Sequence, residues 1–326
     1  MTTQLESVQA EALHPPAPIR GTQSFLGTLA RCWRTPSMLG LELLWRWGVG
    51  IPMLALLAWE ATQILHSVSL AHTGIENFSL IDSVAAAQTL SATMDVLLPP
   101  VRAVAVWLIP TLVVAWSLAA GFGRSAVLRR YDPALPFAPW RMATLQLLRI
   151  VVLSGSFALW FACLHWAAWS SLGGADPDLV GYFVKAIFLS FAIFFFWAAA
   201  GWVFSIAPLL ALLEHRGVLG SLRAALQVGH GSLRGLRPKL IEINLVLGVV
   251  KVALLVLSMV FCASPVPFKA EMKGSTLYVW WALVSVIYFA ASDFFQIARV
   301  AGFIELWRAF NEKPPQGIPA DSGISA

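Results

Sequence analysis

A lysine and an aspartate fall inside two of the most apolar stretches of the sequence. Lys251 lies eleven residues into the stretch that begins at Leu240, and Asp293 lies five residues before the end of the stretch that closes at Ala298. A charged group in hydrocarbon is costly, so such residues mark solute or proton pathways or pair with one another. We expect Lys251 to reach Asp293 between two antiparallel helices, either as the site of a bound or conducted species or as a contact that fixes the helix register.

Three further polar residues accompany this pair. Glu242 and Asn244 lie near the start of the stretch that holds Lys251. Gln296 follows Asp293 by three residues and therefore shares its helical face. Glu242 is nine residues from Lys251, which places the two on nearly opposite faces, so they cannot satisfy each other. These five residues form the predicted binding or proton-linked site.

Two other pairs of opposite charge have positions that predict structural contacts. Glu42 precedes Arg46 by four residues, which is the favourable order for an ion pair on one helix. Glu60 lies near the outer end of the first apolar stretch and Arg102 begins the second, so they can pair across a helical hairpin. We interpret both as structural ion pairs, with a substrate site as the alternative for Glu60 and Arg102.

Motifs for catalysis or cofactor binding are missing from the sequence. It has no GxSxG, HExxH, Walker A or GxGxxG pattern with suitable flanks. Its three cysteines form no CxxC pair, so neither a disulfide framework nor a metal site is indicated. Glu214-His215-Arg216 combines an acid, a base and a cation, as an interfacial hydrolase would, but solvation of a helix end is the simpler interpretation. Nothing in the sequence supports an enzyme, so a membrane enzyme ranks third among the functions considered, and we predict no cofactor and no metal.

The elements that must position these residues are six apolar stretches. The chain has 326 residues, of which 58% are hydrophobic and 12% charged, whereas soluble proteins carry about 25% charged residues. A bilayer core about 30 Å thick is crossed by roughly 20 residues in a helix. The stretches that meet this length are approximately 43–65, 101–121, 147–169, 182–213, 240–263 and 276–298. We therefore predict an all-α polytopic membrane protein with six transmembrane helices.

Segments between and before these stretches have the apolar spacing of amphipathic helices that lie on a membrane surface. They are Thr22–Arg34, which Pro36 should end, Leu80–Leu98, which Pro99-Pro100 should stop, and Val218–Val228. The polar tails 1–21 and 311–326 are predicted to be disordered, which leaves 22–310 as one transmembrane domain.

Positive charges alternate between the loops in a pattern that predicts the orientation. Lys and Arg accumulate in the loops on the cytoplasmic side of a membrane. One side carries Arg20, Arg31, Arg34, Arg124, Arg129, Arg130, Arg141, Arg216, Arg223, Arg234, Arg237, Lys239, Arg299, Arg308 and Lys313. The other side carries only Lys269 and Lys273 among several acidic residues. Both termini are therefore predicted to be cytoplasmic, and the net charge of +5 reflects this bias rather than a nucleic-acid partner.

A short run near the middle of the chain resembles uncharacterised bacterial multi-span proteins that are similar to the membrane domain of glycerophosphodiester phosphodiesterases. It consists of Ala207-Pro208-Leu209-Leu210, Glu214, Gly217, Ser221-Leu222, Ala224-Ala225 and Gly229. The resemblance implies a multi-span architecture in the bacterial inner membrane. It implies no catalysis, because this sequence has no counterpart of the soluble catalytic barrel with its metal-binding carboxylates.

Two functions remain open at this point. The first is a non-enzymatic accessory or interaction protein of the envelope, whose partners are the lipid bilayer and either another membrane protein or a second copy of the chain. The alternative is a small transporter or channel component with its polar site between the fifth and sixth spans. Transporters often have interrupted helices at matching places in two halves. Only the fourth stretch is visibly interrupted, at Gly201 and Pro208, which favours the accessory role.

Overall fold

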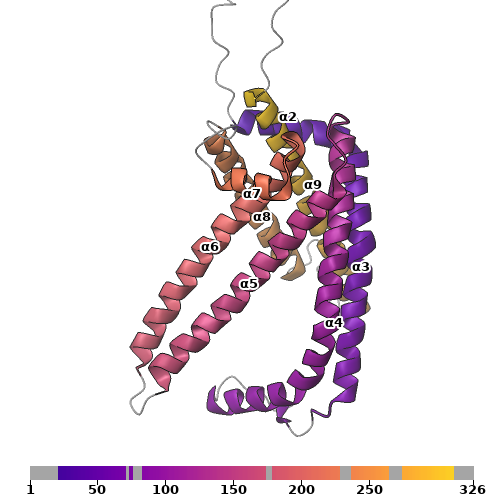
Figure 1. Ribbon diagram of the computed structural model, residues 1–326. Helices are drawn as coiled ribbons and strands as arrows, with labels where there is room; N and C mark the ends of the chain where they lie inside the picture. The colour runs from indigo at the N-terminus through magenta and orange to yellow at the C-terminus, as the bar shows by residue number, and fades with distance from the viewer. Residues whose placement is uncertain are drawn as a thin grey trace, which may run out of the picture. The chain divides into compact units, whose positions relative to one another are not determined.

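The fold is entirely helical over the residues that the computed structural model describes, which are 21–70, 73–75, 83–173, 178–227, 236–263 and 274–311. Within them lie eight helices and no strand (Figure 1). The helices are α2 (Gly21–Arg34), α3 (Pro36–Ser67), α4 (Ser83–Tyr131), α5 (Pro139–Leu172), α6 (Leu179–Leu213), α7 (Val218–Leu226), α8 (Arg237–Ala263) and α9 (Ser275–Asn311). The predicted disordered tails lie outside the described residues, except for Gly21 and Asn311, which are helical.

Six helices are long and apolar enough to cross a membrane, namely α3, α4, α5, α6, α8 and α9. Each contains one of the six stretches predicted from the sequence. Many of their large apolar side chains are exposed, which would be unfavourable in water but suits a helix surrounded by lipid tails. The chain is a polytopic α-helical membrane protein, as predicted.

Pro99 and Pro100 bend the helix α4 (Ser83–Tyr131), although the sequence predicted that they would end a helix. α4 continues over 49 residues and passes through Pro99 and Pro100, and its first part runs at a steep angle to the rest (Figure 1). A proline removes one backbone donor and displaces the preceding turn, which kinks the helix without removing the hydrogen bonds on either side. At Pro36 the prediction is confirmed, since α2 ends at Arg34. Pro36 then begins α3, because the first turn of a helix does not need its N–H.

The chain divides into two compact units. The first contains α2, α7, α8 and α9 with the short adjoining parts of α3, α4 and α6, in residues 1–42, 128–135 and 209–326. The second contains α5 and most of α3, α4 and α6, in residues 43–127 and 136–208.

In the first unit, α2 packs on α9 and α8 through one buried edge. Phe25 and Cys32 are seven residues apart, lie on the same side of α2 and are both buried. Gly302 of α9 lies beneath Phe25, and a β-carbon there would be in ordinary contact, 3.4 Å from Cδ2 of Phe25. A side chain larger than alanine at position 302 would therefore displace α2.

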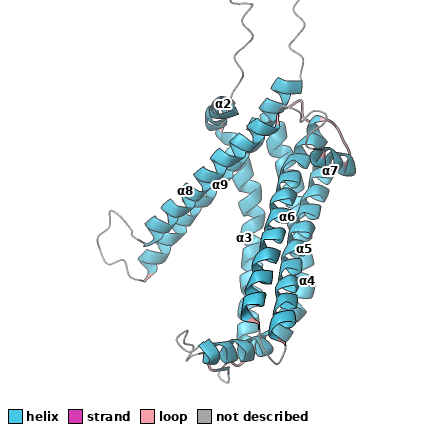
Figure 2. Cartoon of the chain, turned by 90° about the vertical axis from the view of Figure 1, so that its left-hand side faces the viewer, coloured by secondary structure: helices cyan, strands magenta, loops and turns pink. Residues whose placement is uncertain are grey.

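The helices α8 and α9 form an antiparallel pair in the same unit (Figure 2). At the start of α9, Trp280 and Trp281 donate their indole N–H groups to the backbone oxygens of Phe261 and Cys262, over 2.8 and 3.1 Å. The last carbonyl groups of a helix have no partner within it. These two indoles therefore satisfy the end of α8 and join the two helices.

In the second unit, α4 approaches its neighbours closely at two glycines. A β-carbon at Gly121 would lie 2.6 Å from the backbone oxygen of Pro139 and from Cβ of Ala143, both on α5. A β-carbon at Gly123 would overlap the ring of Trp45 on α3. Only glycine allows these contacts, so the two positions determine how closely α3, α4 and α5 pack in this unit.

Candidate functional site

The polar residues predicted to form a site lie on α8 and α9, within the first unit. Nζ of Lys251 is 3.5 Å from Oε1 of Gln296, at the outer limit of a hydrogen bond. Asp293 lies one turn before Gln296 on α9 and is only 6% exposed. The structure thus brings Lys251 to the region of α9 that carries both residues. A direct contact between Lys251 and Asp293 stays a prediction.

Glu242 and Asn244 are less closely connected with this site. Both are half-buried near the start of α8, and they flank the fully buried Ile243. Nine residues separate Glu242 from Lys251, so the two side chains leave α8 on nearly opposite faces. The participation of Glu242 and Asn244 in a common site stays a prediction.

The two ion pairs inferred from the sequence also stay predictions. Glu42 is 3% exposed, and the guanidinium of Arg46 lies over the ring of Trp45, 5.3 Å from its centroid. This cation–π contact is a favourable one for a cation on a transmembrane helix. Glu60 is half-buried and Arg102 is exposed.

The acid, base and cation at 214–216 form a turn after α6. Glu214 makes an ion pair with Arg216, and His215 between them has a φ of 53°. A positive φ is the left-handed conformation in which many helices end. The geometry agrees with the interpretation of this triplet as a solvated helix end.

A polar cluster that was not predicted from the sequence surrounds Glu305, on the part of α9 that extends beyond the predicted sixth span. The carboxylate of Glu305 accepts hydrogen bonds from Thr28 and Arg31 of α2 and from Tyr131 at the end of α4. Thr28 is fully buried, and Nη1 of Arg31 lies 2.5 Å from Oε1 of Glu305. Hydrogen bonds to a charged acceptor are stronger than neutral ones. The cluster therefore fastens α2 and the end of α4 to α9.

A cavity of about 350 Å³ adjoins this cluster in the same unit. Arg31, Arg130 and Arg308 line it together with Glu305 and Asp132, and Asp132 makes an ion pair with Arg308. Three guanidinium groups thus face two carboxylates. No local signal marks this site in the sequence, because its members come from three segments that are far apart along the chain.

The cluster also changes the acid–base behaviour of α2. Burial, supported by the nearby carboxylate of Glu305, raises the pKa of Cys32 to about 11. The same carboxylate raises the pKa of Arg31, so this guanidinium is charged throughout the physiological range. At neutral pH Arg31 is therefore a permanent cation that neutralises the charge of Glu305, and the thiol of Cys32 is un-ionised.

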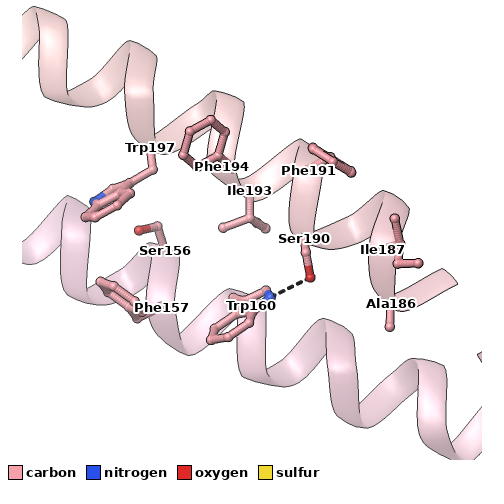
Figure 3. A pocket seen from close by; sticks show the side chains of 10 residues that line it. All are labelled: Ser156, Phe157, Trp160, Ala186, Ile187, Ser190, Phe191, Ile193, Phe194 and Trp197. Carbon is pink, nitrogen blue, oxygen red and sulfur yellow. Dashed lines mark hydrogen bonds between the residues drawn. The ribbon is translucent and has the colours of Figure 1, made fainter. Parts of the chain in front are cut away.

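A second candidate site is an apolar groove between α5 and α6, in the second unit (Figure 3). It encloses about 560 Å³. Phe157 of α5 and Trp197 of α6 meet edge to face, with ring centroids 5.6 Å apart. Further along, Nε1 of Trp160 donates a hydrogen bond of 2.9 Å to Oγ of Ser190. This bond matters in a membrane, because no water is present there to satisfy a buried indole N–H.

None of the ten residues that line this groove is ionisable. Throughout the described part of the chain, no three His, Cys, Asp or Glu side chains are grouped so that they could hold a metal ion. The chain matches no known protein-family model, no curated protein and no solved structure.

Proposed function

We propose that this protein is a non-enzymatic accessory or interaction protein of the bacterial inner membrane, with both termini in the cytoplasm. The proposal rests on the exposed apolar surface of the α5–α6 hairpin. None of the residues in the most apolar part of α6 is buried, and α6 residues between Ala186 and Trp197 line the groove between the two helices. The bias of Lys and Arg across the predicted membrane supports the orientation.

The groove has the properties of a surface that binds another membrane helix. Three small side chains, Ser156, Ala186 and Ser190, line it together with aromatic ones and two isoleucines. Helices associate in lipid mainly through close packing, and small residues allow their backbones to approach. A solute or substrate site normally adds several polar groups that fix the ligand's orientation, whereas here Trp160 and Ser190 bond to each other. The groove therefore favours a partner's helix, or a helix from a second copy of this chain.

A pair of neighbouring phenylalanines offers a matched test of this role. Phe194 lines the groove and Phe195 does not, while both are more than half exposed. A photo-crosslinking benzoylphenylalanine at Phe194 should give one discrete protein adduct in native membranes, and the same probe at Phe195 should not. Native mass spectrometry in nanodiscs should then show the adduct's partner at fixed stoichiometry. The variant Ala186→Trp, whose indole fills the groove, should no longer form this adduct.

Two outcomes would count against the accessory role. One is crosslinking of Phe194 to lipid alone; the other is a set of protein adducts that does not differ between positions 194 and 195. In either case the groove would be ordinary lipid-facing surface.

The second candidate function is transport, favoured by the contact between Lys251 and Gln296 next to the buried Asp293. A conducted species needs a water path to Lys251. The cavity of about 190 Å³ between α8 and α9 is lined instead by apolar side chains such as Leu254 and Phe261. Lys251→Cys, placed in a background without other cysteines, should therefore resist a membrane-impermeant thiol reagent. Rapid labelling would favour transport over the accessory role.

A further inference from the structure

The short helix α2 has two chemically different flanks on either side of its buried edge. Thr28 and Arg31, three residues apart, turn toward Glu305 of α9. Leu26, Ala30 and Trp33 have the four- and three-residue spacing that places them together on the other flank. The hydrogen bonds to Glu305 thus determine the rotation of α2 about its axis, and with it the direction of the apolar flank.

This apolar flank and α9 together line a groove of about 730 Å³. Across from α2, the wall consists of Ala290, Ala291 and Phe294 with their neighbours on α9. Trp33 meets Phe294 edge to face, with ring centroids 5.7 Å apart. The volume is within the range of about 300–1,000 Å³ that is usual for ligand sites. The α9 wall belongs to a membrane-spanning stretch, so an apolar ligand can enter from the lipid.

One cation lines this otherwise apolar groove. Arg34 is exposed in the last turn of α2 and follows directly after Trp33. An apolar groove with a single cation at one flank is complementary to a molecule that has a hydrocarbon chain and a negatively charged head. Basic residues near the cytoplasmic leaflet attract anionic lipids in the same way.

We propose that the groove between α2 and α9 binds an anionic phospholipid, with an acyl chain along α9 and its phosphate at Arg34. The site requires α2 to lie at the cytoplasmic surface and therefore depends on the orientation proposed above. It does not depend on the α5–α6 groove, which lies in the other unit and involves different residues. A partner could therefore fail to bind there while the lipid still binds here.

Native mass spectrometry of the purified full chain tests this site. The protein is titrated with phosphatidylglycerol or with phosphatidylcholine of the same acyl chains, and the first bound lipid is quantified. We expect phosphatidylglycerol to bind more tightly, and Arg34→Gln to reduce this preference about fivefold, the effect of removing one cation near a lipid surface. Arg223→Gln is the matched control, because Arg223 is an exposed cation of α7 that does not line the groove.

A second variant tests the acyl-chain part of the groove. Ala290→Trp should remove the first bound lipid whatever its headgroup, because the indole would occupy the space along α9. The proposal is overturned if the wild type binds both lipids equally, or if Arg34→Gln and Arg223→Gln have the same effect. It is also overturned if Ala290→Trp keeps the lipid while eluting as a folded monodisperse protein. If that variant does not fold, the comparison of the two arginine variants decides.

Discussion

A single methyl group added at Gly121 should destabilise the second unit, although alanine is the better helix former. The β-carbon of Gly121→Ala would lie 2.6 Å from the backbone oxygen of Pro139 and 2.7 Å from the backbone nitrogen of Ala143. Backbone atoms of a packed helix cannot turn away as the end of a flexible side chain can. The change therefore forces α4 and α5 apart.

The expected size of the effect follows from two opposing contributions. Replacing glycine by alanine within a helix stabilises the helix by about 1 kcal/mol. Overpacking a tight contact costs about 1–3 kcal/mol, and contacts with backbone atoms place Gly121 toward the upper end of this range. We expect a net loss of about 1–2 kcal/mol in the free energy of unfolding.

Gly155→Ala is the matched control, since Gly155 lies within α5 and a β-carbon there would have no atom within 4 Å other than the backbone of its own helix. This variant should be as stable as the wild type, or more stable by up to about 1 kcal/mol. Thermal unfolding in lipid nanodiscs, followed by tryptophan fluorescence, compares the three proteins. If Gly121→Ala melted at or above the wild-type temperature, the close approach of α4 and α5 would be refuted.

Two further predictions concern the cluster around Glu305. Cys32 should react with maleimide very slowly at neutral pH, because burial raises its pKa to about 11. The measurement uses a variant whose other two cysteines are serine, and a midpoint near pH 9 in its rate of maleimide labelling would contradict the prediction. Since the folded state holds this proton more tightly, the stability that Cys32 contributes is complete below pH 9 and is lost as the pH rises toward 11. Glu305→Gln keeps an acceptor but loses the charge, so it should cost about 1 kcal/mol, a modest value because Arg31 is 65% exposed. Hydrogen exchange in α2 should accelerate while that in α5 stays unchanged, and equal protection of α2 in both proteins would show that the cluster does not hold it.

The spans were predictable because the cost of placing a segment in lipid depends on that segment alone. The predicted stretch 240–263 lies within α8, which begins at Arg237 and ends at Ala263. The same local reasoning was wrong at Pro99-Pro100, where it predicted a helix end. Proline weakens the backbone at one turn, and whether the chain then stops or bends depends on the packing around it.

The cluster around Glu305 could not be predicted in this way. Thr28 and Glu305 are separated by 277 positions in the sequence, and each has the appearance of an ordinary polar residue near a helix end. Lys251 and Asp293, by contrast, stood out because charge inside an apolar stretch is a local anomaly. The contact of Lys251 with Gln296, one turn from Asp293, still required the pairing of α8 and α9.

The sequence by itself determined that the chain is helical and that six of its segments are apolar enough to cross a membrane; its charge bias predicts which side carries the positive loops. The spans follow from local transfer free energies between water and lipid, and the predicted orientation follows from the Lys and Arg content of the loops. Only the tertiary structure decided that Gly121 lies against a backbone whereas Gly155 lies in open space, and which flank of α2 faces Glu305. In lipid every apolar face of a helix is similarly soluble, so hydrophobicity does not select which faces meet. Close packing and a few hydrogen bonds make that selection, and they exist only once the helices are together.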